Sequence, residues 1–111
     1  MKNWMLLSLF LASTALGDVL IPLNSTWTYV KGTAAPASDW RASAFNAASW
    51  SSGSAPFYYG ENIGAGTFLP DMEDSYTTVF LRRQFNVADP TVVDRMALRA
   101  FIDDGYIVYI N

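Results

Sequence analysis

The stretch FIDDGYIVYIN, Phe101–Asn111, decides the fold that the sequence predicts. Its acidic pair and glycine, Asp103, Asp104 and Gly105, are a typical turn signal, because aspartate carboxylates accept hydrogen bonds from nearby backbone amides and glycine tolerates a positive φ. The run YIVYI that follows, 106–110, is apolar on both faces, as in a central strand that is covered on each side. We therefore expect two strands joined at the acidic turn.

The same acidic pair has a functional alternative, in which it holds calcium, a sugar hydroxyl or a catalytic proton. Adjacent residues of an extended chain point to opposite faces, so Asp103 and Asp104 would rarely converge on one atom. A glycosidase needs two carboxyl groups about 5–10 Å apart, normally from separate strands. The turn interpretation is therefore preferred.

The segment before the turn, 95–102, also favours a strand. Its apolar side chains recur at every second position: Met96, Leu98, Ala100 and Ile102. A helix is a competitor, because Met, Ala, Leu and Arg are good helix formers. The strand is preferred because a turn and a second strand follow immediately.

The last residue, Asn111, suggests that the polypeptide continues. Asparagine after a strong strand usually begins a tight hairpin turn with glycine next, and here no residue follows. A central strand without its neighbour leaves backbone groups unpaired, which costs stability. We expect a domain that is incomplete at its C-terminus.

Two further strands are expected upstream of this hairpin. Trp27–Val30 is a run of β-branched and aromatic residues, and the segment 77–87 alternates apolar side chains with Arg83 as the exception on that face. The region between them, 33–76, is rich in Gly, Pro, Ser and Ala, and its aromatic residues should pin it to the domain. Short strands, turn signals and no long amphipathic helix predict an all-β fold, an antiparallel β-sandwich formed by one domain at 18–111.

The first 17 residues, MKNWMLLSLFLASTALG, have the order of a secretory signal. Lys2 is followed by an apolar stretch over 4–12 and then by small residues up to Gly17. A transmembrane helix needs about 20 apolar residues, and a buried N-terminal helix is the other alternative. We expect a signal peptide at 1–17, export to the cell surface, the periplasm or the medium, and no membrane span after its removal.

Composition excludes several classes of function. The chain has no cysteine and no histidine, so zinc sites, cysteine nucleophiles and Ser-His-Asp triads are excluded. Loss of Lys2 with the signal leaves six basic and ten acidic residues, and no basic cluster exceeds Arg82-Arg83. Nucleic acid is therefore not an expected partner, because its binding needs a basic face.

A sugar site would combine an aromatic ring that stacks on a pyranose with polar groups for the hydroxyls. The candidate residues for carbohydrate binding are Trp40, Trp50, Tyr58, Tyr59, Asp71, Glu73 and Asp74. Each has a structural alternative: the aromatic rings could be core or loop anchors, and the acidic run DMED a solvated loop. Asp103, Asp104, Gly105 and Asn111 are taken as turn residues, and Arg83 as a structural partner of Asp103 or Asp104.

Three segments carry a resemblance to a known family. FNAASWSSGSAPFYYGE (45–61), VFLRRQFNVADPTVV (79–93) and LRAFIDDGYIVYIN (98–111) resemble motifs of galactose-binding-domain-like modules in large secreted bacterial multidomain proteins. The last two segments are also similar to the sugar-binding domain of β-galactosidase and β-glucuronidase enzymes. The chain departs from the pattern in the glycine missing after Asn111 and in the bulky Phe57 and Tyr58.

The resemblance implies a jelly-roll β-sandwich that is truncated at its C-terminus. It implies a non-catalytic accessory module, carbohydrate-binding or carbohydrate-proximal, within a larger secreted hydrolase. The alternative is a structural or adhesive spacer of a cell-surface protein, and a free-standing enzyme is the remotest interpretation. The expected partners are glycans and the rest of the polypeptide. No cofactor is expected. Structural calcium is left open, but no specific motif supports it, since the acidic run lacks the glycine and spacing of an EF-hand loop.

Overall fold

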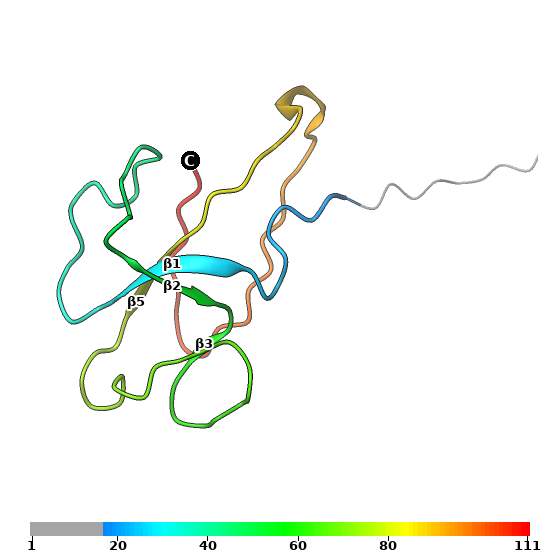
Figure 1. The fold of residues 1–111 in the computed structure, drawn as a ribbon. Helices are drawn as coiled ribbons and strands as arrows, with labels where there is room; N and C mark the ends of the chain where they lie inside the picture. Colours follow the sequence, from blue (N-terminus) through cyan, green and yellow to red (C-terminus); the bar gives the residue numbers. More distant parts are fainter. Residues whose placement is uncertain (1–16) are drawn as a thin grey trace, which may run out of the picture.

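The computed structural model describes residues 17–111, so the expected signal peptide lies, except for Gly17, outside the described residues. The strands in this part of the chain form two small sheets (Figure 1). Their bounds are β1 Thr26–Lys31, β2 Ser51–Ser54, β3 Phe57–Tyr58, β4 Thr67–Phe68 and β5 Val79–Arg82. Between residues 17 and 111 the one helical element is a single 3₁₀ turn, η1 Pro90–Val92.

The larger sheet has the order β2-β1-β5, and both of its pairings are antiparallel. β1 is the central strand, with Tyr29 opposite Ser51 on one side and opposite Leu81 on the other. The strands expected at Trp27–Val30 and within 77–87 are thus confirmed as β1 and β5. Their β-branched and aromatic residues suit a pleated, half-buried surface.

β2 forms from the sequence SSGS, which has no intrinsic preference for a strand. It pairs along the whole of its length with β1, whose free edge supplies the backbone partners. Gly53 is required at this place, since a Cβ atom there would collide with the side-chain hydroxyl of Thr67. β2 is therefore a strand because of its tertiary contacts with β1 and Thr67, and not because of its own residue types.

The smaller sheet pairs β3 and β4 in parallel, with Phe57 opposite Thr67. It follows a cis peptide bond between Ala55 and Pro56. The ring of Phe57 meets the ring of Tyr29 edge-on, with 5.1 Å between the centroids. This contact joins the smaller sheet to the central strand of the larger one.

The core is thin. Leu69 and Tyr76 are the buried apolar residues of the described part of the chain, at 2% and 5% exposure. Both lie in the loop between β4 and β5 and are linked by a short turn in which the Tyr76 amide donates to the Met72 carbonyl. Large apolar side chains elsewhere in the described residues are half-covered or exposed, and a domain of this size buries only a modest share of its surface.

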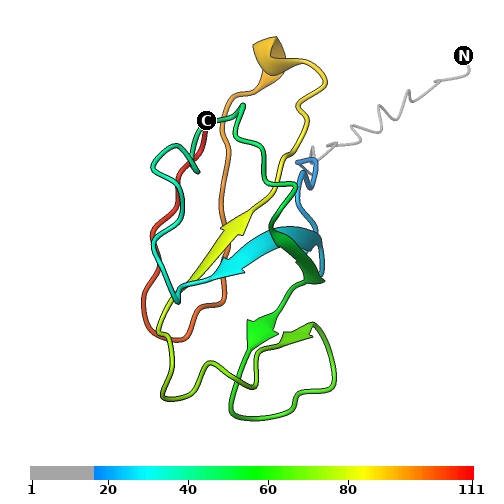
Figure 2. The ribbon, with the colours of Figure 1, turned by 60° about the vertical axis from the view of Figure 1, so that its left-hand side comes forward.

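The C-terminal segment differs most from expectation. The chain has no regular structure through 95–102, bends at Asp103 and Asp104, and then runs back in the opposite direction (Figure 2), and neither arm belongs to a sheet or a helix. The helical alternative for 95–102 is therefore absent, and the expected ladder between the two arms is not formed.

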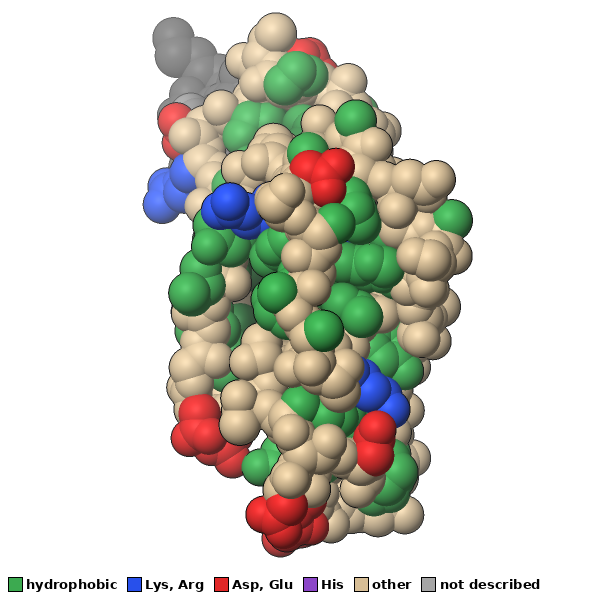
Figure 3. Space-filling model, turned by 90° about the vertical axis from the view of Figure 1, so that its left-hand side faces the viewer, with side chains coloured by type: hydrophobic (Ala, Val, Ile, Leu, Met, Phe, Trp, Pro, Cys, Tyr) green, Lys and Arg blue, Asp and Glu red, His purple; other side chains and the backbone are tan. Residues whose placement is uncertain are grey.

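The expected covering of the YIVYI run is also wrong for the described residues. Ile107 is 79% exposed and Ile110 60% exposed, because among residues 17–111 no second sheet covers this segment, although Tyr109 contacts Trp40. Hydrophobic side chains occupy much of the middle of the face in Figure 3, and acidic side chains appear in both its upper and its lower part. An all-β fold with an antiparallel sheet is confirmed, and residues 17–111 show no second sheet stacked upon it.

Gly66→Ala should destabilise the fold more than Gly60→Ala. Both glycines have a positive φ, +81° and +84°, which costs an L residue about 1–2 kcal/mol. A Cβ atom at Gly66 would also collide with the carbonyl oxygen of Pro56, whereas Gly60 faces open space. We expect an additional loss of about 1–3 kcal/mol for Gly66→Ala, measured by urea denaturation. Equal losses for the two variants would contradict the close approach.

Candidate functional site

Five aromatic side chains hold the connection between β1 and β2 against β5. Trp40 stacks on Trp50, with centroids 6.2 Å apart and planes at 27°. Trp40 also meets Phe80 of β5 and Tyr109 edge-on, at 5.4 and 6.0 Å, and Phe45 meets Trp50 at 5.6 Å. Two of the predicted sugar-binding residues, Trp40 and Trp50, are thus brought together, but they are half-buried and packed on one another.

A hollow of about 330 Å³ lies beside this cluster, and we call it the Tyr109 hollow. It is lined by Ser38, Asp39, Arg41, Ala42, Tyr109 and Asn111. The residues come from two places far apart in the sequence, the β1–β2 connection and the C-terminal arm. Their meeting therefore depends on the aromatic contact between Trp40 and Tyr109.

The polar groups of the Tyr109 hollow are positioned by specific contacts. The guanidinium of Arg41 lies over the Tyr109 ring, 4.6 Å from its centroid. The side-chain amide of Asn111 donates to the backbone carbonyl of Arg41. A carboxylate at Asp39 and a hydroxyl at Ser38 complete the lining. An aromatic ring with convergent hydrogen-bonding groups is the composition expected of a small polar-ligand site.

A second hollow, of about 440 Å³, lies over β1 and β2, and we call it the arginine groove. It is lined by Thr26, Trp27, Thr28, Phe45, Asn46, Ala47, Ser52, Arg82, Arg83 and Gln84. The guanidinium of Arg82 lies 5.1 Å from the centroid of the Phe45 ring. This groove shares no lining residue with the Tyr109 hollow.

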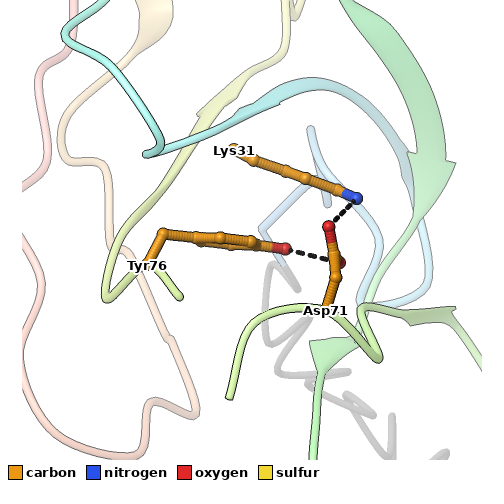
Figure 4. A network of polar contacts seen from close by, with 3 residues as sticks. All are labelled: Lys31, Asp71 and Tyr76. Atoms are coloured by element: carbon orange, nitrogen blue, oxygen red, sulfur yellow. Dashed lines mark hydrogen bonds and ion pairs between the residues drawn. The ribbon is translucent and has the colours of Figure 1, made fainter. Parts of the chain in front are cut away.

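Asp71, another predicted sugar-binding residue, is already engaged within the fold (Figure 4). Its carboxylate accepts from the ammonium group of Lys31 at 2.7 Å and from the hydroxyl of Tyr76 at 3.0 Å. The hydrogen bond from Lys31 holds the pKa of Asp71 below its usual value, and the same bond raises the pKa of Lys31. Burial raises the pKa of Tyr76, with its bond to Asp71 adding to the shift.

The remaining predicted sugar-binding residues lie elsewhere. Tyr58 packs on Phe68 of the smaller sheet, with centroids 5.3 Å apart. Tyr59 is exposed at the end of β3, and Glu73 and Asp74 are exposed in the loop before β5. None of them lines either hollow described above. The seven residues therefore do not form one site within the described part of the chain.

The acidic bend is placed on the surface. Asp103 and Asp104 are both exposed, and the positive φ of the bend, +79°, falls on Asp104 rather than on Gly105. The expected ion pair with Arg83 is not among the contacts of residues 17–111; Arg83 instead donates to the Thr26 carbonyl at 2.5 Å. Exposure of both carboxylates removes any need for a buried cationic partner.

None of the residues that line the Tyr109 hollow was predicted from the sequence to bind a ligand. Asp39 and Arg41 flank Trp40 in the short run DWR, which combines a carboxylate, an aromatic ring and a guanidinium. Tyr109 was assigned to a covered strand, although the residue is 49% exposed. The DWR run was the signal available, but nothing in the sequence places Tyr109 beside it.

Two classes of site are not found in the described residues. No group of three or more His, Cys, Asp or Glu side chains is placed to hold a metal ion. No helix between 17 and 111 is long and apolar enough to cross a membrane. Comparisons with protein-family models, curated proteins and solved structures found no match to this chain.

Asp71→Asn should reduce the loss of folding stability that accompanies a fall in pH. The folded pKa of Asp71 is depressed, so its contribution is present above the unfolded value near 3.8 and is lost as the pH falls through the lower folded value. The folded pKa of Lys31 is raised, so its contribution is lost only as the pH rises above about 10.5. We expect a small effect, because the two side chains are 37% and 51% exposed.

The measurement is the thermal midpoint as a function of pH, from about pH 2 to pH 7. Glu73→Gln is the matched control, since it removes an exposed carboxylate of the same loop that makes no ion pair among residues 17–111. Parallel curves for wild type and Asp71→Asn would show that the network does not stabilise the fold.

Proposed function

We propose that this chain is a non-catalytic, carbohydrate-binding accessory module of a larger secreted hydrolase, built on a galactose-binding-domain-like jelly roll. The single observation that carries the proposal is the Tyr109 hollow. Its aromatic ring, carboxylate, guanidinium, hydroxyl and amide are the groups that recognise a pyranose. Its volume of about 330 Å³ is at the lower end of ligand sites and suits one or two sugar units.

The jelly-roll part of the proposal is supported by the three sequence segments and by the antiparallel sheet. β1 and β5 are neighbours although 47 residues separate Lys31 from Val79, which is a long-range connection of the kind a Greek-key sandwich uses. Segments 45–61 and 79–93 contain β2, β3 and β5. Export is supported by the order of residues 1–17, in which Lys2, an apolar stretch and small residues follow one another.

A catalytic role is not proposed. The carboxylates that lie in loops are either exposed, as in Asp103 and Asp104, or paired, as in Asp71. A general acid or base needs a pocket that tunes its pKa, and the exposed bend offers none. The spacer function remains the second candidate, favoured by the packing of Trp40 on Trp50, which keeps both indoles in structural use.

The test is a glycan-array screen of the full chain, followed by titration calorimetry with the best neutral oligosaccharide. Asp39→Asn should weaken binding by about 10- to 100-fold, since a hydrogen bond to a charged group is worth about 1.5–3 kcal/mol. Tyr109→Ala should weaken binding by about 10- to 100-fold because it removes the aromatic ring on which a pyranose would stack. Tyr106→Ala is the matched control, because Tyr106 lies on the same arm, is 60% exposed, and does not line the hollow.

Two outcomes would contradict the proposal. One is a wild-type chain that binds no glycan, which leaves the spacer function. The other is an equal loss of binding in Tyr106→Ala and Tyr109→Ala, which would indicate a surface effect of the arm and not a site.

A further inference from the structure

The arginine groove concentrates positive charge in a protein that is acidic overall. Arg82 and Arg83 both line it, and its lining contains no aspartate or glutamate. The whole chain carries a formal net charge of −3, with only seven basic residues. Two adjacent arginines facing one hollow without a carboxylate are therefore a local feature that overall composition does not explain.

Both guanidinium groups keep donors for a ligand. One nitrogen of Arg82 donates to the backbone carbonyls of Trp40 and Ala42, and one nitrogen of Arg83 donates to the carbonyl of Thr26. A guanidinium carries five N–H donors, and the hydrogen bonds recorded among residues 17–111 use a single nitrogen of each. The backbone contacts anchor the planes of the two groups, and the planar fork of remaining donors matches the two oxygens of an oxyanion.

The other residues that line the arginine groove suit a ligand of the size and polarity of a sugar. Amide groups come from Asn46 and Gln84, a hydroxyl from Ser52, and apolar surface from the rings of Trp27 and Phe45. A volume of about 440 Å³ lies within the usual range of small-molecule sites. The absence of any wider basic face in this acidic chain makes nucleic acid, with its many phosphates, a poor occupant.

We propose that the arginine groove binds an acidic sugar unit by its carboxylate or sulfate group, with the oxyanion on Arg83 and Arg82 and the ring against Trp27. The choice of a sugar rests on the proposed function, whereas the binding of an oxyanion does not. The groove is separate from the Tyr109 hollow, so the two sites are independently testable.

The experiment is titration calorimetry of the full chain with two pairs of ligands. The carboxylate arm compares a galacturonic acid trisaccharide with its methyl ester, and the sulfate arm compares a sulfated galactose disaccharide with its desulfated form. We expect the acidic member of at least one pair to bind more tightly by tenfold or more, and its binding to weaken as sodium chloride is added.

Arg83→Gln should lower affinity for the acidic ligand by about 10- to 100-fold, the size of a lost charged hydrogen bond. The affinity of Arg83→Lys for the acidic ligand should lie between those of the wild type and Arg83→Gln, because lysine keeps the charge and loses the planar fork of donors. Arg95→Gln is the charge-matched control: the Arg95 side chain is 88% exposed and lies outside the groove, and we expect less than a twofold change.

Two results would overturn the proposal: no preference for the acidic member in either pair, or an equal loss in Arg83→Gln and Arg95→Gln. If Arg83→Gln fails to fold, Arg83→Lys and the salt dependence of the wild type decide. Tyr109→Ala distinguishes the two proposals, since it should weaken binding of neutral glycans by about 10- to 100-fold and leave that of acidic ones unchanged. Neutral binding without any acidic preference would retain the Tyr109 hollow and remove the groove.

Discussion

The arrangement of both hollows depends on the side chain of Arg82. It leaves the end of β5, lies over the Phe45 ring, and donates to the carbonyls of Trp40 and Ala42 in the β1–β2 connection. Both carbonyls belong to irregular backbone, and that of Ala42 also accepts from the Phe45 amide, so the charged donor of Arg82 ties this connection to the end of β5. The aromatic cluster around Trp40 then packs on a backbone already held in place, and the DWR run is presented toward Tyr109.

Much of the sheet could be predicted from residue type and alternation, and the rest required three-dimensional partners. β1 and β5 follow from β-branched and aromatic runs at Trp27–Val30 and Val79–Arg82. β2 could not be found this way, because SSGS becomes a strand only beside β1. The C-terminal arm shows the opposite failure: its strong β preference is present, but preference without a neighbouring strand does not produce a ladder.

The candidate sites, like the sheet, could be predicted only in part from the sequence. Sequence reasoning identified aromatic and acidic residue types suited to sugars, and two of them, Trp40 and Trp50, do meet. It could not identify the hollows, because each is assembled from segments far apart in the chain, as Arg41 and Tyr109 are in one and Asn46 and Arg82 in the other. It also assigned Asp71 to a ligand, whereas a lysine 40 residues away already holds that carboxylate.

The exposed arm after η1 has a consequence for the colloidal behaviour of the chain. The run 106–110 is uncharged, contains no proline, and presents open backbone donors and acceptors together with apolar side chains such as Ile107. Short segments of this composition template cross-β stacking when left uncovered. Arg95, Arg99, Asp103 and Asp104 flank the run on one side, where such charges act as gatekeepers against ordered self-association. In a concentrated solution of the isolated chain, we therefore expect self-association through the run 106–110 under conditions in which the sheet itself is still folded.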